Sequence, residues 1–208
     1  ISNEKQLDDW IENLNKSSVI SVDTETSSLD PLEAELIGVS FCFEKNKACY
    51  VPIAHVEKKL DKKIIINKIK KILEDPSIKK VGQNIKYDYR IFLKEGIRIN
   101  PIDDTMLMSY VLDAGMNRHN LDLLSELHLG HKPISYKDLT GSGKKQLRFA
   151  EVDIKKAAEY AAEDADVTFR LFKIFDERLK EEKLKHIYEM FEKPLVQILS
   201  QMETNGIK

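Results

Sequence analysis

Hydrophobic residues follow two different spacings along this chain, and the change between them separates a strand-forming half from a helical half. Segments rich in valine, isoleucine, phenylalanine and cysteine predict β-strands at residues 18–22, 35–43 and 48–53. Two further strands are predicted at 79–83 and 97–102, each next to a helical pattern.

Apolar residues at helical spacing predict helices at residues 64–75, 85–96, 105–114 and 153–181, and a last helix that starts around Pro194. Pro76 ends the first helix, Gly96 suits the left-handed turn that closes the second, and Asp104 is expected to cap the third. From Asn120 onward the pattern is helical. Strands, then alternating strands and helices, then a helical tail predict an α/β fold with a mixed central sheet flanked by helices.

Composition fits one soluble domain. The chain has 208 residues, 42% of them hydrophobic and 33% charged, which is enough to bury one sizeable core. Its apolar runs are too short to cross a bilayer, and its first ten residues lack a signal peptide's apolar stretch. The net charge of −2 argues against binding nucleic acid by bulk electrostatics.

Two cysteines and several lysine runs have mainly structural interpretations. If residues 41–43 and 48–50 form a hairpin, Cys42 and Cys49 could face each other across it, but two buried thiols are expected in an intracellular protein. The runs KKLDKK, KIKK and SIKK are interpreted as solvated faces. The run GSGKKQLR, in a glycine-serine loop, is a better candidate for touching phosphates.

Acidic residues in three separate segments are the main candidates for chemistry. Asp23 and Glu25 are two apart in a predicted strand, so both side chains leave the same face, where they are costly unless paired or metal-bound. The alternative for this pair is a strand edge in solvent. Tyr160 and Asp164 are four apart and share one side of the long helix, a spacing that also occurs in purely structural pairs.

Asp88 lies early in its helix, where the helix dipole alone would favour an acid. Together with the other three acids it suggests more, because four carboxylates gathered by a fold repel one another and need cations to balance them. Sites made of carboxylate oxygens suit hard ions such as Mg²⁺ and Mn²⁺.

The segments VDTETSSLD, GQNIKYD and YAAEDAD resemble the three motifs of the 3′→5′ proofreading exonuclease domain of bacterial-type (family A) DNA polymerase I. That family belongs to the tyrosine-bearing branch of the wider DEDD exonuclease superfamily. The similarity covers nearly the whole chain, and the closing METNGIK resembles the junction where the polymerase domain begins. The resemblance implies a ribonuclease H-like fold, an exonuclease domain over residues 1–192, and the start of a helical junction over 193–208. The polymerase domain would belong to the same full-length chain.

The resemblance also implies a role for each acid. Asp23 would bridge two divalent cations, Mg²⁺ or Mn²⁺, while Glu25 and Asp164 complete the tighter site and Asp88 holds the second ion largely through water. Tyr160 would orient the attacking water together with Glu25. This division of roles agrees with the general chemistry of two-metal phosphodiester hydrolysis.

Further positions match the family's contacts with a single-stranded 3′ end. Residues near the strand are implied at Gln83, Asn84 and Tyr87. Leu29 matches the apolar wedge against the terminal base, Arg118 a phosphate-contacting arginine, and Tyr136 an aromatic contact.

The predicted function is therefore two-metal-ion 3′→5′ hydrolysis of single-stranded or frayed DNA ends to deoxynucleoside 5′-monophosphates. The alternatives are an RNA-trimming exonuclease with the same acids and a catalytically silent structural or DNA-binding module of a polymerase. We expect a monomer in the bacterial cytosol or nucleoid, with a DNA 3′ end as its partner and no membrane partner.

Overall fold

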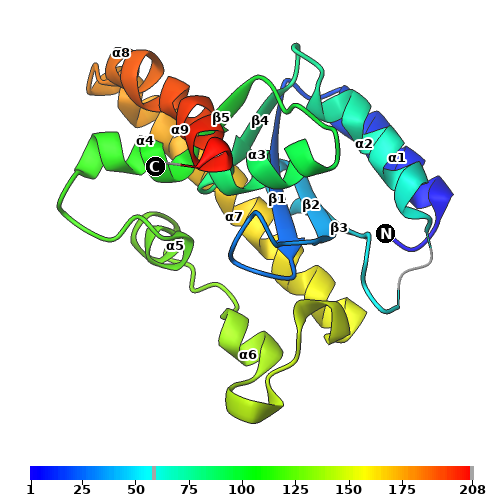
Figure 1. Ribbon diagram of the computed structural model, residues 1–208. Coiled ribbons are helices and arrows are strands. Elements are labelled where there is room, and N and C mark those ends of the chain that lie inside the picture. The colour runs from blue at the N-terminus through cyan, green and yellow to red at the C-terminus, as the bar shows by residue number, and fades with distance from the viewer. Residues whose placement is uncertain (58–59, 207–208) are drawn as a thin grey trace.

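A five-stranded mixed sheet forms the centre of the computed structural model, which describes residues 1–57 and 60–206 (Figure 1). Its strands are β1 (Val19–Thr26), β2 (Leu36–Glu44), β3 (Lys47–Pro52), β4 (Lys79–Gly82) and β5 (Ile102–Asp104). The strand order is β3-β2-β1-β4-β5: β2 runs antiparallel to both β3 and β1, and β4 and β5 run parallel to β1. The central strand β1 therefore joins an antiparallel half to a parallel half.

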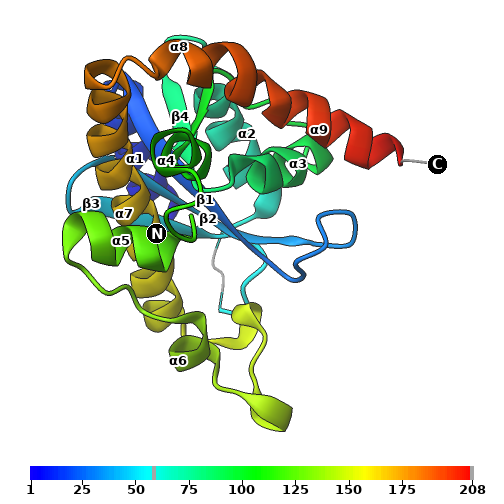
Figure 2. The ribbon, with the colours of Figure 1, turned by 90° about the vertical axis from the view of Figure 1, so that its left-hand side faces the viewer.

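Helices cover both faces of the sheet, with α7 on one side of β1 and α2 and α3 on the other (Figure 2). The helices are α1 (Glu4–Asn15), α2 (Lys62–Leu73), α3 (Ile85–Lys94), α4 (Thr105–Asp113), α5 (Leu121–Leu129), α6 (Tyr136–Thr140), α7 (Ile154–Glu181), α8 (Lys185–Ile187) and α9 (Lys193–Asn205). The 3-10 turns η1 (Gly143–Lys145) and η2 (Phe149–Glu151) and the π-helical turn η3 (Tyr188–Glu192) complete the set. The predicted α/β fold with a mixed sheet is confirmed.

The two faces of β1 differ in character. Ile20 and Val22 are fully buried in the core shared with α1, α2 and α3. The alternate residues face α7, where Ser21 donates a hydrogen bond from Oγ to the Ala165 carbonyl at 2.7 Å. Ala161 and Ala165 are fully buried, and their small side chains let α7 approach the sheet closely. Asp23 and Glu25 therefore leave β1 on the α7 side, as their spacing predicts.

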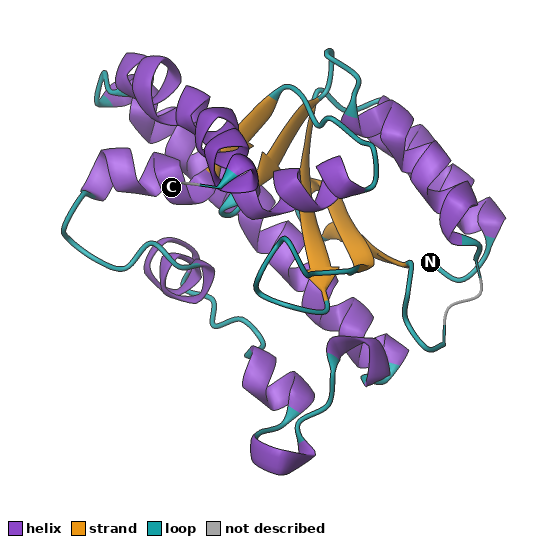
Figure 3. Cartoon of the chain, in the orientation of Figure 1, coloured by secondary structure: helices purple, strands orange, loops and turns teal. Residues whose placement is uncertain are grey.

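Most predicted boundaries are confirmed. Gly96 has φ +74° and follows the end of α3, and Asp104 accepts the Met106 amide at the start of α4. The long helix extends over Ile154–Glu181, and Pro194 lies in the first turn of α9. Helices, turns and loops make up the described part of the chain after Asn120 (Figure 3).

The strand predicted over residues 97–102 is wrong except at its last residue. The backbone of this segment is engaged elsewhere: the Ile97 amide donates to the Phe92 carbonyl at the end of α3, and the Asn100 amide donates to the Leu73 carbonyl. Pro101 has no amide hydrogen to contribute. Pairing with β4 begins only at Ile102, which lies opposite Lys80.

The predicted hairpin forms, but the two cysteines do not face each other in it. Cys42 pairs with Ala48 and Cys49 pairs with Phe41, so the two side chains leave opposite faces of the sheet. Both are buried free thiols, as expected, and burial is the largest effect that raises the pKa of each to about 12.

One lysine of the predicted solvated runs is buried. Lys80 has no exposed surface, and its Nζ donates to the carbonyls of Asp75 and Asn100 at 2.7 and 2.5 Å. Burial lowers its pKa to about 8. Residues 58 and 59 of the first run lie outside the described residues. Within the described ranges, no helix is both long and apolar enough to span a membrane.

Candidate active site

The site forms where β1 extends beyond its parallel neighbour. β4 pairs with β1 only over Val19–Ser21. Further along, the Thr24 amide donates to Asp88 Oδ1 at 3.0 Å instead of to a strand, and the Thr24 hydroxyl donates to the same oxygen at 2.5 Å. The helix α3 thus takes the place that a longer β4 would occupy, and it brings Asp88 to β1.

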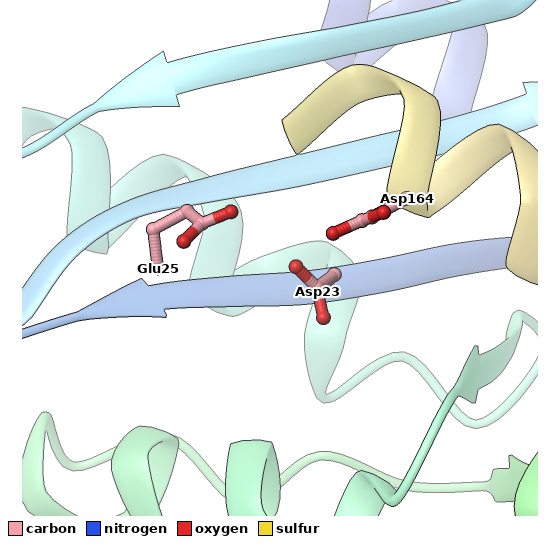
Figure 4. A group of neighbouring side chains, drawn as sticks. All are labelled: Asp23, Glu25 and Asp164. Atoms are coloured by element: carbon pink, nitrogen blue, oxygen red, sulfur yellow. The ribbon is translucent and has the colours of Figure 1, made fainter. Parts of the chain in front are cut away.

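Three of the acids converge from β1 and α7 (Figure 4). Asp23, Glu25 and Asp164 each offer a carboxylate oxygen, and these oxygens all lie within 4.8 Å of one another. Glu25 and Asp164 are each only 8% exposed. The strand spacing and the helix spacing therefore bring together the groups that the sequence singled out.

All four acids have raised pKa values. Burial, the largest cause, raises the pKa of Asp23 to about 7. Burial together with repulsion from Asp23 raises the pKa of Glu25, Asp88 and Asp164 well above the ordinary carboxyl value. Among the described side chains, no lysine or arginine forms an ion pair with any of the four. Buried carboxylates without a protein cation form a donor set that fits hard divalent ions.

Tyr160 lies beside this cluster within a group of aromatic rings. Its ring centroid is 6.1 Å from that of Tyr136 and 6.2 Å from that of Phe149. Burial, followed by the negative charge of Asp164, raises the pKa of its phenol above the ordinary tyrosine value. The phenol is therefore neutral at physiological pH and keeps its proton for hydrogen bonding.

A cavity of about 660 Å³ opens over the acids. All but one of the predicted site residues line it: Asp23, Glu25, Leu29, Gln83, Asn84, Tyr87, Asp88, Tyr136, Tyr160 and Asp164. Leu29 is 95% exposed, so it projects freely at the cavity's edge. The structure thus assembles one concave surface from β1, the loop after it, and α3, α6 and α7.

Arg118 does not line the cavity. It is exposed in the connection between α4 and α5. Its neighbour His119 accepts a hydrogen bond at its carbonyl from Gln83 Nε2 at 2.7 Å, which places this connection next to the cavity wall. None of the described side chains of residues 141–148 lines the cavity either, and the side chain of Lys144 lies outside the described part.

Asp104 fixes the start of α3. Asn84 adopts a left-handed conformation (φ 59°, ψ 46°), which turns its amide and that of Ile85 toward the Asp104 carboxylate, each at 3.0 Å. The same carboxylate caps α4 at Met106. Sequence patterns predict the α4 cap from adjacent residues but give no sign of the second cap, which joins residues 20 positions apart.

Polar residues at the end of β1 and directly after it also line the cavity, and the sequence analysis did not single them out. These are Thr24, Thr26, Ser27 and Ser28. The Tyr87 hydroxyl donates to the Ser28 carbonyl at 2.5 Å and shares a 2.5 Å hydrogen bond with Thr26 Oγ1, so it anchors the loop that carries Leu29. The polar run TETSS, residues 24–28, which leads from Asp23 to Leu29, is the signal that could have indicated this loop.

The chain belongs to the 3′-5′ exonuclease family of polymerase-A type, whose family model matches residues 1–180. It is 43% identical over 222 residues to DNA polymerase I of Rhizobium leguminosarum, covering 97% of this chain and 22% of that protein. It is 42% identical to DNA polymerase I of Borreliella burgdorferi, covering 100% of this chain and 22% of that protein. The chain thus spans about a fifth of the length of these relatives, and the predicted family resemblance is confirmed.

Solved structures share the fold. Brucella melitensis NrnC superposes with a TM-score of 0.74 at 21% identity, covering 92% of this chain and 87% of that one. Escherichia coli RNase D, an exoribonuclease involved in structured RNA processing, gives a TM-score of 0.71 at 18% identity, covering 97% of this chain and 50% of that one. The ribonuclease H-like exonuclease fold is confirmed. A structure of NrnC also contains bound Mg²⁺.

Proposed function

We propose that this chain is a two-metal-ion 3′→5′ exonuclease that removes deoxynucleoside 5′-monophosphates from single-stranded or frayed DNA ends, as the proofreading part of a DNA polymerase I. One observation carries the proposal: four carboxylates, three of them buried and that of Asp23 half-buried, line one open cavity, and no described lysine or arginine neutralises them. Membership of the 3′-5′ exonuclease family supports the reaction type. Identity to polymerase I sequences supports the choice of DNA.

The acids would hold two Mg²⁺ or Mn²⁺ ions. The cluster of Asp23, Glu25 and Asp164 suits one ion, and Asp88 would hold a second ion together with Asp23. Asp88 is close enough for its charge to raise the pKa of Glu25, although burial, Asp23 and Asp164 have larger effects. Bound cations supply charge neutralisation, activation of the attacking water, and stabilisation of the leaving oxygen. Thr24 keeps the Asp88 carboxylate aimed at the cavity by binding its Oδ1.

Tyr160 would position the attacking water together with Glu25. Because its phenol keeps its proton, Tyr160 can orient water through a hydrogen bond but is a poor general base. Glu25 offers a carboxylate oxygen that can accept a hydrogen bond from the same water. The two side chains line the same cavity from α7 and β1.

The strand end would be held mainly by stacking. Tyr136 offers an aromatic surface inside the cavity, and Leu29, at the edge, can pack against a terminal base. Stacking contributes about 1–3 kcal/mol per base and does not depend on sequence, which suits proofreading. Gln83, Asn84 and Tyr87 line the wall where the strand would pass, and Arg118 would meet a phosphate outside the cavity.

Residues 1–192 would form the exonuclease domain, and residues 193–208 would begin the junction to a polymerase domain. Two observations bear on this junction: Val196 of α9 is buried in the main core, and Glu203 bridges Lys86 and Arg90 of α3 at 2.6 and 2.8 Å. The described part of the proposed junction therefore packs against the exonuclease domain. The last two residues of METNGIK lie outside the described residues.

RNA trimming is the second candidate, because RNase D shares the fold. Incubation with matched single-stranded DNA and RNA oligonucleotides separates the two. Faster release of mononucleotides from DNA supports the proposal, and equal or faster release from RNA favours the alternative.

A chelator tests for catalysis itself. Nucleotide release should stop in chelator and return with Mg²⁺ or Mn²⁺, and a frayed duplex end should be degraded faster than a paired one, because strand separation costs free energy. A chain that releases no nucleotide under any of these conditions would be the catalytically silent module.

A further inference from the structure

Glu163 lies between Tyr160 and Asp164 in sequence, but its carboxylate binds a different part of the molecule. Its Oε2 accepts the Ile134 amide at 2.6 Å, and its Oε1 lies 2.8 Å from His131 Nε2. The side chain is only 20% exposed. Both contacts reach the connection between α5 and α6, 29 and 32 residues away in sequence.

An acid at this position is costly for the site. Glu163 directly precedes Asp164 on α7, so it adds a negative charge beside the acidic cluster. An additional negative charge is unfavourable beside carboxylates that already repel one another. The two hydrogen bonds of Glu163 offset this cost, because a carboxylate that accepts an amide hydrogen forms a charge-assisted bond of more than ordinary strength.

The anchored connection leads directly to Tyr136. Ile134 is two residues before Tyr136, and Ser135 between them caps α6 by accepting the Asp138 amide at its Oγ at 3.1 Å. The α6 segment lies away from the sheet, at the lower end of the molecule in Figures 1 and 2. The bond from Glu163 therefore ties the start of this outlying segment to α7.

We propose that Glu163 is a positioning residue that holds Tyr136 in the cavity through the backbone of Ile134. It would thereby govern binding of the strand end and leave the chemical step to the four acids. The Tyr136 ring lies 6.1 Å from Tyr160, at an interplanar angle of 71°, so the two rings have a defined geometry that depends on where α6 begins. This inference rests on the proposed function only for the identity of the ligand that Tyr136 contacts.

The variant Glu163→Ala tests the role. The Kd for a single-stranded DNA oligonucleotide, measured by fluorescence anisotropy in chelator, should rise about tenfold, the size of one lost stacking contact. In Mg²⁺ the KM should rise similarly while kcat stays within about twofold of the parent value. Glu159→Ala is the matched control, since Glu159 is exposed on the same helix one turn earlier. An unchanged KM in Glu163→Ala overturns the proposal.

A double variant shows whether Glu163 acts through Tyr136. Glu163→Ala combined with Tyr136→Ala should bind DNA no more weakly than Tyr136→Ala alone, because residues that act as one unit are not additive. Fully additive losses overturn the proposal. Glu163→Gln retains an acceptor for the Ile134 amide, and it should restore most of the affinity.

Two measurements separate this inference from the proposed function. Hydrogen exchange over residues 131–140 should accelerate in Glu163→Ala but not in Glu159→Ala. Unchanged exchange overturns the inference whether or not the chain degrades DNA. Mn²⁺ affinity, measured by calorimetry, should stay within about twofold of the parent. A tenfold change would mean that Glu163 acts on Asp164 instead, and it would also overturn the inference.

Discussion

At the scale of single residues, the site is defined by carboxylates that none of the described lysines or arginines neutralises. Burial raises the pKa of Asp23, Glu25, Asp88 and Asp164, and repulsion from Asp23 raises the pKa of the other three further.

Replacing Asp164 by asparagine should separate activity from stability. Nucleotide release in Mg²⁺ should fall by more than about 100-fold, because a ligand contributes at least as much as the groups that orient it. The melting temperature in chelator should rise, since one of the mutually repelling buried carboxylates is gone. Thermal melting by circular dichroism and an oligonucleotide assay check both effects. Glu159→Gln, on the exposed side of the same helix, should change neither.

Replacing Tyr160 by phenylalanine should slow turnover without loss of metal binding. The ring remains packed between Tyr136 and Phe149, while the hydroxyl that would orient water is lost. We expect kcat to fall by about 10²-fold, within the range for loss of a positioned proton-bearing group. Mn²⁺ titration calorimetry should give the parent affinity. A weakened affinity would show that Tyr160 supports the metal ligands instead.

At the scale of elements, short contacts between segments distant in sequence place the helices that carry the site. Asp104 joins the starts of α3 and α4, Thr24 holds Asp88, and Glu163 holds the connection before α6. The Asp104 contacts use backbone amides at helix starts, where amide groups otherwise have no partner within the helix, and the other two use the amides of a strand edge and of a loop.

Asp104→Ala should therefore destabilise the fold more than an ordinary cap substitution. It would leave the amides of Asn84, Ile85 and Met106 without their acceptor; the Ile85 bond is buried and the other two are partly buried. The expected loss is about 2–4 kcal/mol in the free energy of unfolding, against about 1 kcal/mol for Asp153→Ala, an exposed cap of α7. Urea denaturation of the two variants provides the comparison. Equal losses would mean that Asp104 serves only one helix.

The same contacts mark how far the sequence could predict this site. Period-two and period-four spacing placed Asp23 with Glu25 and Tyr160 with Asp164, because those relations are local. The bond between Thr24 and Asp88 spans 64 residues, and no local pattern encodes it. The strand expected over 97–102 failed for a related reason, since the composition was suitable but the amides of Ile97 and Asn100 bond to α3 and α2.

At the scale of the whole molecule, the acidic cluster should govern how stability depends on pH. In the unfolded chain its carboxyls titrate near pH 4, whereas in the folded chain their pKa values are raised, to about 7 for Asp23. Between these values the folded state binds more protons than the unfolded state. The stability from this cluster is thus complete below about pH 4 and is lost as pH rises toward and beyond about 7.

We therefore expect the melting temperature in chelator to fall between pH 5.5 and pH 8, and Mg²⁺ or Mn²⁺ to restore it at pH 8 by binding only the folded state. Acids whose pKa values are lowered by ion pairs, such as Asp113 with Arg178, lose their contribution only at lower pH. Asp164→Asn should flatten the decline. A melting temperature that rises from pH 5.5 to pH 8 without metal would contradict the assignment.

The short pairing between β1 and β4 has a consequence for how this fold can vary. Only three residues of β1 pair with β4, and the vacant edge beyond them is where Asp88 reaches the Thr24 amide. An insertion that lengthened β4 by two residues would pair with that edge and displace Asp88 from the Thr24 amide. Loops elsewhere on the surface can tolerate added residues, whereas the strand-to-helix turn at Gln83 and Asn84 must keep its length for Asp88 to reach the Thr24 amide.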